Sequence, residues 1–225
     1  MKKSKRYQQA VKLIDKDIYN LDEAIDILKS MPRAKFDESV DINCVLAVDT
    51  KKSEEMVRGF VVLPNGRGKK VKVLVFCELE KEEEAKKAGA DYIGSQELAD
   101  KILKEGWLDF DACISTPSMM RVVSKLGKIL GPKGLMPSPK IGTVTDNIAN
   151  AVKETKAGKV EFRTDKFGVV ALSVGKISFS KQALLENIKA FLDALNNAKP
   201  SSVKGDFIKS MYISTTMSPS LKIKI

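Results

Sequence analysis

The chain has 225 residues, of which 43% are hydrophobic, and its 39 Lys and Arg against 29 Asp and Glu give a formal net charge of +10. This length allows one large domain or two small ones, and the cationic excess predicts an acidic polymer or surface as the partner. The chain contains no histidine, which removes the commonest general base and every Ser-His or Cys-His nucleophile, so the composition disfavours an enzyme.

We expect neither a targeting segment nor a metal site in this protein. It has no run of about 18 apolar residues, and its start, MKKSKRYQQAVKL, lacks the apolar stretch of a secretory signal, so we expect a cytoplasmic protein with no membrane partner. Cys44, Cys77 and Cys113 each lie in an apolar, strand-like run without a second Cys at ligand spacing. We expect buried thiols and neither a metal site nor a disulfide.

The first segment has the pattern of a helix followed by two strands. Asn20 and Glu23 have the spacing of a helix cap with its reciprocal partner, and apolar residues then repeat at helical spacing over 21–28. Residues 40–48 alternate between apolar and more polar side chains, and 60–63 is a shorter apolar run. This alternation is typical of strands with one face on a core.

The middle segment changes to alternating strands and helices. It begins after the turn-rich, cationic stretch 64–70, and its first strand, 71–76, is apolar throughout, as in strands covered on both faces. The elements that follow are a helix over 81–87, a strand over 91–93, a helix capped by Ser95, a strand over 112–115 and a helix over 146–156. This order predicts parallel crossovers and a three-layer α/β unit.

The last segment returns to the first pattern. Residues 160–164 and 169–174 predict a hairpin around DKFG, followed by a helix capped by Ser180 and a last strand over 207–215. The first and last segments are each too small for a core of their own, but together they supply an antiparallel-type sheet and helices.

We therefore predict an α/β (α+β) fold of two domains. A discontinuous split β-α-β domain is built from both chain ends, residues 1–67 and 159–225, and a three-layer Rossmann-like α/β domain, residues 68–158, is inserted into it.

The Gly, Pro and Lys run from Gly127 to Gly142 is the most unusual segment. It lacks the Gly-Lys-Ser/Thr ending of a phosphate-binding loop, and no GxGxxG follows the Val71 strand. Gly66, Gly68 and Lys69 indicate a phosphate-binding loop only weakly, because Lys70 stands where a Ser or Thr is needed to bind magnesium. An ordered, proline-stiffened surface loop is the simpler interpretation, and a nucleotide-dependent enzyme using the inserted unit is the disfavoured alternative.

Two further segments have residue types suited to RNA. In RAKFDES, residues 33–39, Lys35 can bind phosphate, Phe36 can pack on ribose or base, and Ser39 can bond a 2′-hydroxyl, although Phe36 can equally anchor a helix to the sheet. STTMSPS, residues 214–220, offers small hydroxyls and exposed backbone that allow close approach to an RNA groove. Taken alone, the segment is only a polar tail.

Taken in order, the chain's motifs resemble those of the bacterial ribosomal protein L-one family. The segments are KFDESVDINCVLAVDTKKSEEMVRGFVVLPNGRGKKVKVLVF, KAGADYIG, GWLDFDACISTPSMM, KLGKILGPKGLMPSPKIGTVT, KAGKVEFRTDKFG and YISTTMSPS. They cover nearly the whole chain, and KLGKILGPKGLMPSP is similar to the family's signature.

This resemblance implies a function in the ribosome. The implied partners are large-subunit ribosomal RNA at the mobile lateral stalk, transfer RNA at the nearby exit site, whose release when deacylated the protein assists, and the messenger RNA of the protein's own operon, which it represses. It implies no cofactor, and a monomer off the ribosome. A general messenger or transfer RNA chaperone is a third interpretation, and it differs only in specificity.

The resemblance also implies RNA-contact residues and two departures from the family pattern. The contacts fall on Lys35, Phe36, Ser39, Ser210, Thr216, Met217, Ser218 and Pro219, with the basic residues Lys51, Lys52 and Lys166 in addition. Ser218 stands where many relatives have glycine, and Ala171 stands where many have histidine.

Overall fold

The computed structural model describes residues 4–224 and divides the chain into two compact units. One comprises Met1–Gly68 together with Val160–Ile225, and we call it the terminal unit; the other, Lys69–Lys159, is the inserted unit. The boundaries predicted after residues 67 and 158 each lie one residue before those of the structure.

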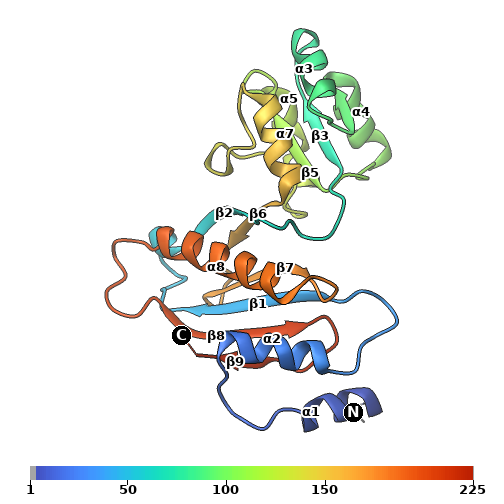
Figure 1. Cartoon of the computed structure of the whole chain (residues 1–225). Coiled ribbons are helices and arrows are strands. Elements are labelled where there is room, and N and C mark those ends of the chain that lie inside the picture. Colours follow the sequence, from blue (N-terminus) through green and yellow to red (C-terminus); the bar gives the residue numbers. More distant parts are fainter. Residues whose placement is uncertain (1–3, 225) are drawn as a thin grey trace. The chain divides into compact units, whose positions relative to one another are not determined.

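The terminal unit contains a four-stranded antiparallel sheet with helices (Figure 1). The strands, in sheet order, are β7 (Val169–Lys176), β1 (Ser39–Leu46), β8 (Ile208–Thr215) and β9 (Leu221–Ile223). The helices are α1 (Lys5–Lys12), α2 (Leu21–Ser30) and α8 (Lys181–Asn197).

Alternation along β1 gives this sheet two different faces. Val40, Ile42, Cys44 and Leu46 are buried in one core with the apolar residues of α2 and α8, and the residues between them are only partly buried. The two helices pack on each other, α8 on β7 and α2 on β8 and β9. Both helices therefore cover the same face, and the opposite face carries polar side chains.

The predicted hairpin around DKFG is wrong. The chain does reverse there, because Asp165 accepts hydrogen bonds from the backbone N–H groups of Phe167 and Val169, both at 2.8 Å. However, β6 (Lys159–Arg163) pairs with β2 (Arg58–Val62) in a separate two-stranded sheet, while β7 pairs with β1. β6 and β7 therefore do not pair with each other, because each pairs with a strand that is distant in the sequence.

The inserted unit is a parallel sheet between two layers of helices, as the sequence predicts. The sheet order is β4 (Tyr92–Gly94), β3 (Val73–Phe76) and β5 (Ala112–Ser115). The helices are α3 (Glu82–Lys87), α4 (Gln96–Glu105), α5 (Met120–Val123), α6 (Gly127–Leu130) and α7 (Ile148–Ala157). Its short 3₁₀ helices are η2 (Leu79–Lys81), η3 (Ser124–Leu126) and η4 (Pro139–Ile141), whereas η1 (Ser53–Glu55) belongs to the terminal unit.

Each face of β3 has its own apolar core. Leu74 and Phe76 pack with residues of α4 and α5, and Val73 and Val75 pack with residues of α3 and α7. All four side chains are fully buried, which explains why the run is apolar without alternation.

Several local expectations need correction. Residues 127–142 are not simply a surface loop, because they begin as α6 and bury Leu130 and Ile141. Asn20 and Ser95 stand at helix N-termini but make no side-chain cap hydrogen bond. The elements α1 and β9 were not expected from the sequence.

The three cysteines are free and buried, as predicted. Burial raises the pKa of the Cys44 thiol to about 12 and also raises those of Cys77 and Cys113. Within residues 4–224, no helix is both long and apolar enough to span a membrane.

Candidate nucleic-acid interface

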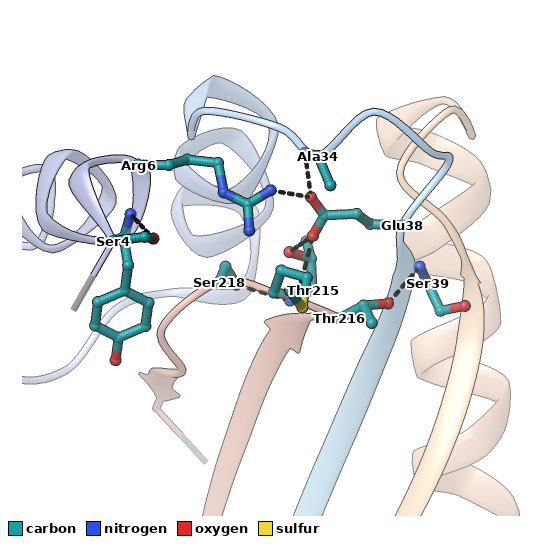
Figure 2. Close-up of polar contacts among 10 residues, drawn as sticks. Ser4, Arg6, Ala34, Glu38, Ser39, Thr215, Thr216 and Ser218 are labelled. Carbon is teal, nitrogen blue, oxygen red and sulfur yellow. Dashed lines mark hydrogen bonds and ion pairs between the residues drawn. The ribbon is translucent and has the colours of Figure 1, made fainter. Parts of the chain in front are cut away.

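Two segments distant in the sequence meet at one end of the four-stranded sheet. They are residues 33–39, which lead into β1, and residues 215–220, which join β8 to β9; together we call them the rim. The Ser39 N–H donates to Thr216 Oγ1 at 3.0 Å, and the Thr216 N–H donates to the Ser39 carbonyl at 3.1 Å (Figure 2). The rim is therefore a continuous hydrogen-bonded surface.

A buried carboxylate connects the rim to a third segment of the chain. Glu38 is 3% exposed, and it accepts hydrogen bonds from the Ala34 N–H at 2.6 Å, Thr215 Oγ1 at 2.5 Å and the Met217 N–H at 3.1 Å. Figure 2 shows Arg6 of α1 reaching the same carboxylate, with 3.7 Å between Arg6 Nη1 and Glu38 Oε1. One side chain thus holds together both rim segments and α1.

The surroundings of Glu38 favour its charged form. Burial acts to raise the pKa of this carboxyl, but the hydrogen bonds from Thr215, Ala34 and Met217 and the charge of Arg6 outweigh burial and lower it below the usual value of 4.5. Glu38 is consequently a carboxylate at neutral pH, able to accept all of these hydrogen bonds.

The turn after β8 is closed by its own serine. The Thr215 N–H donates to Ser218 Oγ at 2.8 Å, and Ser218 Oγ donates to the Pro219 carbonyl at 2.9 Å. Pro219 is buried, which is at odds with its predicted RNA contact, whereas Thr216 is exposed and Met217 is 51% exposed. The turn therefore exposes residues 216 and 217, whereas the Ser218 hydroxyl is hydrogen-bonded within the turn and Pro219 is buried.

Two of the predicted contact side chains project freely from the rim. Phe36 is 53% exposed, which favours RNA contact over the alternative that the ring anchors a helix to the sheet. Lys35 is exposed and takes part in none of the ion pairs found in residues 4–224. Nearby, Lys176 Nζ donates to Ser39 Oγ at 2.9 Å, which adds a cation that the sequence analysis did not identify.

The other predicted cations lie elsewhere. The Thr50 hydroxyl donates to the Lys166 carbonyl at 2.9 Å, so the loops of Lys51, Lys52 and Lys166 are neighbours beyond the other end of β1. At roughly 3.3 Å per residue, the length of β1 separates them from the rim by about 23 Å. Lys52 also pairs with Glu55 at 3.1 Å. The predicted residues thus form two groups.

The open face of the sheet lies between these two groups. Ser210 is on it, opposite Val45. Closer to the rim, the face has a shallow hollow of about 370 Å³, lined by Asp41, Asn43, Ala171, Leu172, Ser173, Ser214, Thr215, Thr216 and Ser218. Most of these residues were missed from the sequence, because only strand register brings them together.

Comparison with known proteins assigns the family. A model of the "Ribosomal protein L1p/L10e family" matches residues 28–219, which include both rim segments up to Pro219. The chain belongs to this family. The resemblance found from the sequence motifs is thereby confirmed.

Relatives in the L1p/L10e family match over almost their whole length. "Large ribosomal subunit protein uL1" of Thermosipho africanus is 54% identical over 99% of this chain and 96% of the relative. The proteins of the same name from Thermosipho melanesiensis and Fervidobacterium nodosum are each 53% identical, over 99% and 100% of this chain and 96% of each relative. Membership of a ribosomal-protein family favours a structural role over the nucleotide-dependent enzyme.

Proposed function

We propose that this chain is a constituent of the large ribosomal subunit and binds large-subunit ribosomal RNA through the rim of its terminal unit. The observation that carries the proposal is the rim itself, in which an exposed aromatic ring, a free lysine and small hydroxyls are held on one hydrogen-bonded surface. The names of the relatives and the net charge of +10 support the same conclusion.

The rim residues divide into three chemical roles. Lys35 neutralises a phosphate, and Phe36 and Met217 lie against a base or ribose. Because the oxygen of the Thr216 hydroxyl already accepts from Ser39, its proton is available to donate to a ribose or phosphate oxygen. Pro219, being buried, fixes the turn and makes no direct contact.

The second group of cations extends the binding track. Lys51, Lys52 and Lys166 lie at the far end of the sheet, so an RNA stem that crosses the open face meets cations at both ends. Ser210 lies along this path.

The resemblance to the family supports a more specific role. In this proposal the RNA site is the mobile lateral stalk, where the protein assists release of deacylated transfer RNA from the exit site, and the same rim binds the operon messenger RNA to repress its translation. The protein acts as a monomer off the ribosome.

A titration tests the proposal. The purified chain is titrated with a transcript of the lateral-stalk stem-loop and with a random-sequence stem-loop of the same length, at several salt concentrations. We expect the stalk RNA to bind about a thousandfold or more tightly than the random RNA, and both affinities to fall with salt. Equal affinities for the two RNAs would contradict the proposal and favour a general RNA chaperone.

A further inference from the structure

The hollow on the open face of the sheet is built from three strands in register. Asp41 of β1 lies between Ser173 of β7 and Ser214 of β8. The next outward residue of β1, Asn43, lies opposite Ala171 on β7. Because outward side chains on adjacent strands stand side by side, these residues form a compact polar group next to the rim.

The polar groups in the hollow have unused hydrogen-bonding capacity. Among residues 4–224, Asp41, Asn43, Ser173 and Ser214 form no side-chain hydrogen bond or ion pair, although each is partly buried. The neighbouring carboxylate of Glu38, by contrast, accepts three hydrogen bonds from the protein. Partly buried polar groups that lack a protein partner are satisfied by water or by a ligand.

The shape of the hollow also has a local cause. The pairing of β1 with β7 shifts register between Val40 and Asp41, and such a bulge bends and twists the strands. Ala171, with its short side chain, leaves the hollow open.

The chemistry of the lining selects the part of an RNA that fits. None of the described residues that line the hollow is a Lys or Arg, and the negative charge of Asp41 repels phosphate. The carboxylate accepts hydrogen bonds from N–H and O–H donors, which in RNA are the amino and imino groups of bases and the 2′-hydroxyls. The volume of about 370 Å³ lies within the range of small-ligand sites.

We propose that the hollow receives one unstacked nucleotide of the bound RNA, with Asp41 accepting a hydrogen bond from its base or ribose and Asn43 completing the recognition. The inference rests on the proposed function, because the nucleotide belongs to the RNA held by the rim. The hollow thereby contributes sequence or sugar specificity, whereas the cations contribute affinity for any RNA.

The charge of Asp41 allows a test in which the proposal and simple electrostatics predict opposite changes in RNA affinity. On a surface that binds a polyanion, removing a carboxylate raises affinity through electrostatics alone. If Asp41 accepts a hydrogen bond from RNA, D41N instead weakens binding of the stalk RNA, because a strong charge-assisted bond is lost. The matched control is D193N, which makes the same charge change at an exposed position of α8, the helix that covers the other face of the sheet.

Two neutral substitutions test the hollow without changing its charge. N43A removes an amide whose side chain points away from the core, and A171F fills the hollow with a ring on the exposed side of β7. Thermal melts of each variant establish that the fold is retained.

The full-length variants are titrated with the lateral-stalk transcript and the random stem-loop at one salt concentration. We expect D41N, N43A and A171F each to weaken binding of the stalk RNA about tenfold or more, while D41N binds the random RNA as well as or better than wild type. If wild type discriminates between the RNAs but the three variants behave like D193N, this inference alone is wrong. If wild type does not discriminate, the proposed function is wrong and the inference falls with it.

Discussion

Among single residues, Glu38 has the largest expected effect on the rim, because three chain segments depend on its carboxylate. Glu38→Gln removes the charge while keeping the shape. We expect it to lower the free energy of unfolding by about 2 kcal/mol at pH 7, the range for hydrogen bonds to a charged group. Urea unfolding measures this, with Glu54→Gln, a change at an exposed carboxyl, as the control.

The effect of Glu38→Gln should depend on pH in a defined direction. Because the folded state lowers the pKa of Glu38, its charge contributes stability that is present above the ordinary value of 4.5 and is lost as pH falls through the lower folded value. The stability difference between wild type and Glu38→Gln should therefore shrink in acid. A difference that stays constant from pH 7 to pH 3 would show that the charge of Glu38 is not what stabilises the rim.

Phe36 and Lys35 should have distinguishable effects on RNA binding. Phe36→Ala should weaken binding of the stalk RNA by about 1 to 3 kcal/mol, because a stacking contact is lost. It should leave the melting temperature unchanged, because the ring is 53% exposed. Lys35→Ala should weaken both RNAs and reduce the slope of log affinity against log salt by about 0.7 to 0.9. A fall in melting temperature for Phe36→Ala, with normal binding by the folded protein, would instead assign the ring a packing role.

At the scale of elements, the turn between β8 and β9 is shaped by Ser218. From the sequence alone, Ser218→Gly is expected to be neutral or slightly favourable for RNA binding, because it removes a Cβ from a close approach. The structure reverses this expectation, since the Ser218 hydroxyl bonds to the Thr215 N–H and the Pro219 carbonyl.

We therefore expect Ser218→Gly to make the turn more flexible and to weaken binding of the stalk RNA by about 1 kcal/mol. Amide exchange of Thr215 should become faster in the free protein. Ser201→Gly, at an exposed position outside the rim, is the control. Unchanged exchange and unchanged affinity would mean that the serine hydroxyl does not hold the turn.

The same scale shows what a sequence can and cannot predict. The apolar run over residues 71–76 and the alternation over residues 40–48 correctly predicted β3 and β1, because burial on two faces or on one face determines which side chains along a strand are apolar. The hairpin at DKFG was mispredicted because the strands on either side have longer-range partners.

The candidate site was only partly predictable for a related reason. Exposed Phe36 and Lys35 lie in one recognisable motif, but the row of Asp41 with Ser173 and Ser214 exists only through register between distant strands. Nothing in the sequence distinguishes Glu38 from an exposed acidic residue, because its partner Thr215 is distant in the sequence and is brought near only by the fold.

At the scale of the whole molecule, the two units should be separable. The terminal unit has its own core, and every residue of the proposed interface belongs to it. We expect a chain in which a short Gly-Ser linker replaces residues 69–159 to fold and to keep stalk RNA affinity within about tenfold of the full chain. Complete loss of binding by a folded protein of this kind would place essential contacts in the inserted unit.

The position of the RNA on the full-length chain tests the central claim most directly. Hydrogen exchange, measured by mass spectrometry with and without the lateral-stalk transcript, reports which backbone segments the RNA protects. We predict slower exchange on binding at residues 33–39 and 215–220, the two rim segments joined through Glu38, and little change over 69–159. Protection confined to residues 69–159, with exchange at the rim unchanged, would contradict the account.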